Sequence, residues 1–131
     1  MDICLYMSKI KGTGAERELI KILWGAGWAC IRSAGSGSTR YPSPDILAGN
    51  RIRRVALEVK LTKDKAKYFS DEEIKQLIAF AAYFGAEPWI AIKFTKSGWI
   101  FVNPEDLVKT AKGYVFKSES FNGLNFEEFV K

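Results

Sequence analysis

The residues that could do chemistry in this chain are carboxylates and lysines, because its 131 residues include no histidine. A Ser-His-Asp triad, a Cys-His pair and a histidine general base are therefore excluded. The two cysteines, Cys4 and Cys30, are too few for a metal pattern or a disulfide framework, so we expect reduced thiols in an intracellular protein. The remaining chemistry must use carboxylates, Lys, Arg, Ser, Tyr or a hard metal ion.

Three candidates, Asp45, Glu58 and Lys60, lie in or beside segments with strand character. Alternate side chains of a strand share a face, so Glu58 and Lys60 should project together from the strand predicted over residues 53–61. A turn at residues 49–52 would make the strand that Asp45 begins antiparallel to it and bring the two carboxyls close. Neighbouring carboxylates repel, and a divalent cation relieves that repulsion.

The pattern Pro44-Asp45, twelve further residues and then Glu58-Val59-Lys60 resembles the PD-(D/E)xK motif of nucleases. Such a short pattern also arises by chance. The alternative reading is an ordinary Glu–Lys pair on an exposed strand face. The β-branched run around Glu58 favours the nuclease reading.

A third acid, Glu16, lies in a helix predicted over residues 11–27. It could point toward the same end of the sheet. It could equally complete a capping box with Thr13 at the start of that helix, a role that needs no chemistry. Arg32 ends the first strand and is either a surface charge or a phosphate contact.

The remaining pattern predicts a single α/β domain with a central mixed sheet of about five strands flanked by helices. We expect a basic connector at residues 63–67, a helix capped by Ser70 and Glu73 that is buried on more than one side, and a short helix starting at Pro104. The predicted strands cover residues 28–33, 45–48, 53–61, 89–94 and 99–102.

The charge is uneven. The chain has a net charge of +5 and a pI of about 9.2, and residues 1–67 hold 13 Lys and Arg against 6 Asp and Glu. A basic surface suggests a polyanion, with nucleic acid ahead of an anionic membrane. No apolar run is long enough for a membrane helix and no secretory signal is visible, so we expect a cytoplasmic protein. The Lys and Arg residues of this basic half that could bind phosphates are Arg40, Arg51, Arg53, Arg54, Lys63, Lys65 and Lys67.

Several segments together resemble the archaeal Holliday junction resolvases, which have a restriction-endonuclease-like fold. They occur in the family's order and span a family-like core of about residues 11–102. Residues 104–131 read as a C-terminal extension. The matching segments are residues 11–20, 31–36, 44–50, 58–60 and 91–94, followed by Gly98-Trp99.

The resemblance implies a homodimer that resolves four-way DNA junctions by paired, symmetric, metal-dependent nicks in recombination and repair, close to the nucleoid. Asp45 and Glu58 would hold Mg²⁺, with Mn²⁺ as a substitute, and the backbone carbonyl of Val59 would be a third ligand. Glu16 would be a further acid at the metal, and Lys60 would act on the attacking water and the developing charge. The residues implied to contact phosphate are Arg17, Arg32, Ser33 and Ser36.

Three other readings stay open. Another PD-(D/E)xK nuclease would share the site but cut flaps, ends or duplex. A non-catalytic DNA-binding module would keep the basic surface and be indifferent to Asp45→Asn. A protein-interaction domain would show no salt-dependent affinity for DNA.

Overall fold

The computed structural model describes the backbone of residues 3–33 and 41–131, and the side chains of residues 14–33 and 41–131. The helices are α1 (Ile3–Gly25), α2 (Asp71–Phe84) and α3 (Phe126–Phe129), with one 3-10 turn over Pro104–Asp106. The strands are β1 (Ala29–Arg32), β2 (Ile46–Gly49), β3 (Arg54–Thr62), β4 (Ala66–Ser70), β5 (Glu87–Phe94), β6 (Gly98–Val102), β7 (Val108–Lys109) and β8 (Gly113–Lys117).

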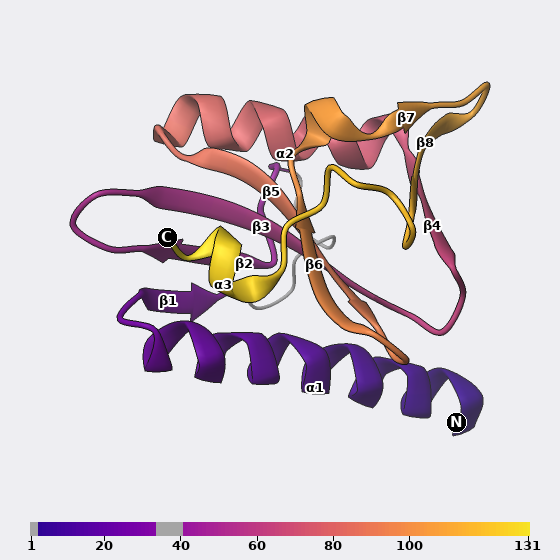
Figure 1. The fold of residues 1–131 in the computed structure, drawn as a ribbon, viewed down its shortest axis with the longest axis horizontal. Coiled ribbons are helices and arrows are strands. Elements are labelled where there is room, and N and C mark those ends of the chain that lie inside the picture. Colours follow the sequence, from indigo (N-terminus) through magenta and orange to yellow (C-terminus); the bar gives the residue numbers. More distant parts are fainter. Residues whose placement is uncertain (1–2, 34–40) are drawn as a thin grey trace.

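The central sheet has five strands in the order β1-β2-β3-β5-β6. The β3–β5 pair is parallel and the other pairs are antiparallel, which confirms the predicted mixed sheet. Figure 1 shows α1 and α2 on opposite sides of this sheet. No helix in the described part of the chain is both long and apolar enough to cross a lipid bilayer.

Each face of the sheet has its own hydrophobic core. Leu19 and Leu23 of α1 pack with Val55 and Leu57 of β3 on one face. On the other face, Ala56 of β3 packs with α2. The alternation of side chains along β3 therefore divides the strand between two buried layers, as expected for a strand covered on both sides.

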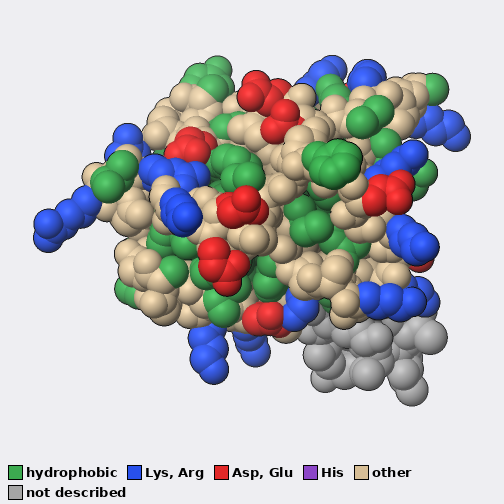
Figure 2. Space-filling model, viewed as in Figure 1, with side chains coloured by type: hydrophobic (Ala, Val, Ile, Leu, Met, Phe, Trp, Pro, Cys, Tyr) green, Lys and Arg blue, Asp and Glu red, His purple; other side chains and the backbone are tan. Residues whose placement is uncertain are grey.

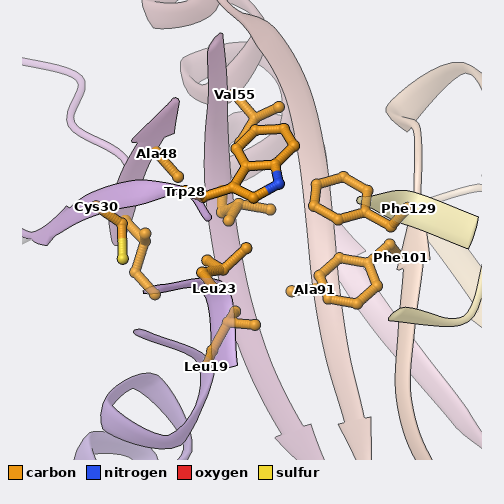
Figure 3. Packing of buried hydrophobic residues seen from close by; sticks show 11 residues of the cluster. Leu19, Leu23, Trp28, Cys30, Ala48, Val55, Ala91, Phe101 and Phe129 are labelled. Carbon is orange, nitrogen blue, oxygen red and sulfur yellow. The ribbon is translucent and has the colours of Figure 1, made fainter. Parts of the chain in front are cut away.

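The C-terminal helix α3 is part of the first core. Phe129 is fully buried, and its ring stacks on Phe101 with centroids 4.2 Å apart. Figure 3 shows these rings beside Trp28 and the aliphatic residues of α1. The guanidinium of Arg53 lies over the rings of Trp28 and Phe129, donates to the Phe129 carbonyl oxygen and forms an ion pair with Glu87.

The first helix begins earlier than predicted. α1 starts at Ile3, so Thr13 lies inside the helix and the predicted capping box of Thr13 and Glu16 is wrong. Threonine or glycine inside a helix costs only up to about 1 kcal/mol, which a long helix tolerates. A capping pattern in the sequence shows where a helix can begin, but the helix can also begin earlier.

The predicted basic connector at residues 63–67 and the predicted helix after Pro104 are also corrected. Part of the connector forms β4, which pairs with β8 in a second sheet of order β4-β8-β7. Only Pro104–Asp106 is helical, and β7 follows. β4 and its partner β8 are more than forty residues apart in sequence, so no local pattern indicates their pairing.

The second long helix begins as predicted and differs in burial. Ser70 caps α2, the capping box with Glu73 is present, and Gly85 ends the helix in the left-handed region with φ 84°. Only Ile74, Leu77 and Ala81 are buried, whereas Ile78, Tyr83 and Phe84 are exposed. The expectation of burial on more than one side is wrong for the single chain, because one face of α2 packs on the sheet and none of the described residues buries Ile78, Tyr83 or Phe84 on its other sides.

Candidate active site

Strand β3 places Glu58 and Lys60 side by side. They lie two and four residues after Ala56, whose side chain packs against α2. Alternate side chains of a strand share a face, so Glu58 and Lys60 also project on the α2 side of the sheet. Each is only partly exposed, and the Lys60 Nζ lies 3.7 Å from Glu58 Oε1. This juxtaposition is the one that the strand periodicity predicted.

Asp45 is fixed where β2 meets β3. The last residue pair of the two strands is Ile46 with Leu57, so the next position brings Asp45 level with Glu58. The buried Asp45 carboxylate accepts a hydrogen bond from the Val59 N–H at 2.8 Å, and its own N–H donates to the Leu57 carbonyl at 3.0 Å. The predicted approach of the Asp45 and Glu58 carboxyls is confirmed, since the two side chains are within hydrogen-bonding distance.

The Glu58 carboxyl is unusual in its acidity. Its burial, the charge of Asp45 and the hydrogen bond between them raise the pKa of Glu58 to about 8, against the opposing pull of Lys60. Ionising both of these neighbouring carboxyls would cost free energy, because their negative charges repel. One proton therefore stays on the pair near neutral pH. A divalent cation would take the place of that proton.

Lys60 is held from the other side by Glu73, the third residue of α2. Its Nζ lies 2.6 Å from Glu73 Oε1, while Glu73 Oε2 accepts from the Ser70 N–H at 2.9 Å. Burial opposes the lysine charge, but the hydrogen bond to Glu73 and the charges of Glu58, Glu73 and Asp45 together raise its pKa. Lys60 is therefore an ammonium ion at neutral pH.

Glu73 was not among the predicted site residues. Its capping box gave a sufficient structural reason for its presence, and that role is real. The structure shows that its second carboxylate oxygen is free to bind Lys60 as well. No sequence pattern indicated this second role, because β4, the strand that leads into α2 beside Lys60, was itself not predicted.

Glu16 reaches the site from α1, and its partner is Arg32. Arg32 Nε donates to Glu16 Oε2 at 2.8 Å. Burial and the charge of Asp45 raise the pKa of Glu16, while the Arg32 guanidinium works against that shift. Glu16 therefore lines the cavity as the partner of Arg32, and its predicted role at a metal ion stays a prediction.

These groups surround one cavity of about 420 Å³. It contains all four predicted catalytic residues, from α1, from the start of β2 and from β3. Its walls are formed by Glu16, Ser43, Asp45, Glu58, Val59, Lys60, Glu73, Gln76 and Leu77.

The donor atoms in this cavity suit a hard cation held by few protein ligands. Among the described residues, no three Asp, Glu or Cys side chains gather into a metal-binding group. Asp45 and Glu58 supply two carboxylates, and Val59 also lines the cavity. Mg²⁺ is commonly bound by one or two carboxylates and keeps several waters, so the residues present fit it.

The predicted DNA-contacting residues are scattered. Arg17 and Lys63 are exposed, and the Ser33 hydroxyl lies 2.9 Å from that of Ser43 beside the cavity. Arg54 begins β3, four residues before Glu58, and its Nε donates to the Gly85 carbonyl oxygen.

Two of the predicted contacts, Ser36 and Arg40, lie outside the described residues. The prediction that Arg53 contacts DNA is corrected, because its guanidinium is bound within the fold by the Glu87 carboxylate and the Phe129 carbonyl oxygen.

Known proteins share both sequence and fold with this chain. The family profile described as "Archaeal holliday junction resolvase (hjc)" matches residues 7–131. The crossover junction endodeoxyribonuclease Hjc of Archaeoglobus fulgidus is 45% identical over 106 residues, covering 81% of this chain and 78% of that protein. The Hjc protein of Methanocaldococcus jannaschii is 38% identical over 105 residues, covering 80% of this chain and 74% of the relative.

The structural similarity is equally extensive. The solved structure of Archaeoglobus fulgidus Hjc, described as a Holliday junction resolvase, superposes with a TM-score of 0.86 at 41% identity. The match covers 92% of this chain and 100% of that one.

Proposed function

Because this chain belongs to the archaeal Holliday junction resolvase family and is a crossover junction endodeoxyribonuclease, we propose that it hydrolyses a junction phosphodiester in the cavity of Asp45 and Glu58. The observation that carries this assignment is the close approach of the two carboxyls at the junction of β2 and β3, with the Lys60 ammonium beside them. The alternative of a non-catalytic module gives no reason for so costly a cluster of charges.

Asp45, Glu58 and the Val59 carbonyl would hold Mg²⁺, or Mn²⁺ in its place, and Glu16 would add negative charge from α1. When bound, the cation would lower the pKa of a coordinated water and neutralise charge on the phosphoryl oxygens. Asp45 is kept in place by the hydrogen bond from the Val59 N–H, so its carboxylate would be oriented before the ion binds. Glu58 would lose its proton as it becomes a ligand.

Lys60 would stabilise the negative charge that develops on the attacked phosphate. Its raised pKa favours the charged form, which suits electrostatic stabilisation better than proton abstraction. Glu73 holds the ammonium within reach of the cavity and limits the freedom of the lysine side chain. Arg17, Arg32 and Ser33 lie on the α1 and β1 side, where they would contact the backbone near the cut bond.

We further propose a homodimer, since a four-way junction requires two coordinated nicks and a two-fold substrate suits a two-fold enzyme. An apolar face is available beside the site. Two hollows of about 390 and 210 Å³ share Ile31 and Leu47, and the exposed Trp24 and Phe84 border the larger one. Strand β1 is an edge of the central sheet, so a second copy could cover both the strand and this face.

We propose that the protein acts in the cytoplasm with the chromosome, in recombination and repair, because that is where junction DNA would form. The test of the activity is a nicking assay on an immobile four-way junction with Mg²⁺, with a chelator and with Asp45→Asn. Asparagine can still accept from the Val59 N–H, so the variant should fold and bind the junction but not cut it. Asp106→Asn makes the same chemical change at an exposed position outside the cavity and should cut normally.

Two results would contradict the proposal. Normal cutting by Asp45→Asn would remove the carboxylate from the mechanism. Equal cutting of linear duplex, flaps and junctions would mean a nuclease of the same fold with another substrate.

A further inference from the structure

One face of the second sheet packs in the core with α2, and the other face is exposed at its edges. Residues paired directly across antiparallel strands share a face. Tyr68 pairs with Val115, and Val115 pairs with Val108, so these three form a row on the outer face. Phe69 and Phe116, one residue along, are buried in the core with α2. The two ends of this row are exposed, since Tyr68 shows 67% and Val108 62% of its surface to solvent, while Val115 between them is buried.

This small sheet and its adjoining residues concentrate the positive charge of the protein. Residues 63–70 and 108–117 contain six lysines and one aspartate, a net +5 that equals the net charge of the whole chain. In the view of Figure 2, Lys and Arg side chains line the right-hand side of the molecule, where Figure 1 places β4, β7 and β8. The C-terminal part of the chain thus belongs to the basic surface, although its overall composition is slightly acidic.

One of the six lysines is already used. Lys109 pairs with Asp71 at 2.6 Å and lies over the Tyr114 ring. The other five form no ion pair with any side chain that the structure describes. Those five are Lys63, Lys65, Lys67, Lys112 and Lys117.

The outer face of β4 begins beside the proposed active site. Ser70, the last residue of β4, is hydrogen-bonded to Glu73, which binds Lys60. From Ser70 to Ala66 the strand extends about 13 Å at about 3.3 Å per residue. That length corresponds to about four base pairs of duplex at 3.4 Å each. Lys117 lies opposite Ala66 at the far end.

We propose that this outer surface, composed of Tyr68, Lys117 and the exposed Lys63 and Lys65, binds the sugar–phosphate backbone of the DNA arm next to the phosphate being cut. This proposal rests on the proposed function and specifies where the substrate continues beyond the cavity. The lysines neutralise successive phosphates, and the Tyr68 ring and hydroxyl contact the sugar and phosphate between them. The sheet is a rigid support, so it fixes the direction in which the arm leaves the site.

The chemistry of this surface fits DNA better than a protein. Lysine is depleted in the buried centres of protein interfaces. The only large exposed hydrophobic residues on the outer row are Tyr68 and Val108, which is a small apolar area. A polyanion, in contrast, gains from every unpaired lysine by releasing counterions.

The test measures junction binding in chelator, so that no cutting occurs, over a range of salt concentrations. The double variant Lys65→Gln/Lys117→Gln should bind about tenfold more weakly, and the slope of log affinity against log salt should fall by about 2. The matched control Lys21→Gln/Lys131→Gln removes the same charge from α1 and the C-terminus and should bind as the parent does. Tyr68→Ala should weaken binding more than Tyr68→Phe.

An unchanged affinity and salt slope in the Lys65/Lys117 variant would overturn the proposal, as would an equal loss in the control. This failure is distinct from failure of the proposed function. If the parent protein does not nick the junction at all, the function is wrong. If it does and the variant binds normally, only the assignment of this surface is wrong.

Discussion

Glu58 illustrates how a single residue of this site trades stability for chemistry. Burial and the neighbouring Asp45 raise its pKa to about 8 from an ordinary value of 4.5. Between these two pH values, the folded protein holds a proton that the unfolded chain has released. The free energy of unfolding therefore falls as the pH rises through this window and levels off above it.

We expect Glu58→Gln to be more stable than the parent protein in chelator at pH 8.5, by on the order of 2–3 kcal/mol, and equally stable near pH 4.5. Glutamine is neutral and can still donate to Asp45. Denaturant unfolding at several pH values measures the difference. Mg²⁺ should reduce this difference in the free energy of unfolding, because it should stabilise the parent more than the variant. A variant that is less stable at pH 8.5 would show that the charge of Glu58 is not costly in the fold.

At the scale of elements, the site depends on where α2 begins. After β3 the chain forms β4, and β4 leads directly into α2. The first turn of α2 lies beside Lys60 of β3. The carboxylate of Glu73 both caps the helix and binds the lysine. The first turn of α2, which follows directly on β4 of the second sheet, thereby becomes part of the proposed catalytic cavity.

This arrangement predicts that Glu73→Ala lowers the single-turnover cutting rate by about tenfold, equivalent to roughly 1.4 kcal/mol of barrier. Junction affinity should change by less than about twofold, because Glu73 orients Lys60 and does not itself neutralise phosphate. Glu73→Gln keeps one oxygen acceptor, which can serve Lys60 or Ser70 but not both as the two carboxylate oxygens do, and should recover part of the rate. Glu72→Ala, one residue earlier and outside the cavity, is the control. Parent-like cutting by folded Glu73→Ala would reduce Glu73 to a helix cap.

For the whole molecule, the main unexplained feature of the single chain is the apolar surface across β1, β2 and α2. Ile31 is 66% exposed and Phe84 49% exposed, and both border hollows with almost wholly apolar walls. Exposed apolar surfaces of this kind commonly mark interfaces. Because the surface adjoins Ser33 and Ser43, a dimer through it would set the relative position of the two cavities.

We therefore expect sedimentation of the parent protein to give twice the 14.8 kDa mass of one chain. Ile31→Lys should shift the protein to monomer, since a charge would be buried without a partner. The monomer should still bind DNA but lose paired nicking. Phe121→Lys, at a fully exposed position, should remain dimeric. A monomeric parent protein, or a dimeric Ile31→Lys, would place the two-fold contact elsewhere or exclude it.

The local sequence determined the five central strands, the capped start of α2 and the approach of Asp45, Glu58 and Lys60. These depend on alternation, turn residues and caps, which act over only a few neighbouring residues. Three features were decided by tertiary structure alone: the pairing of β4 with β8, the ion pair of Glu16 with Arg32, and the second role of Glu73. Each joins residues far apart in the chain or gives one side chain two partners. Such contacts arise only when whole elements pack, so short-range patterns contain no record of them.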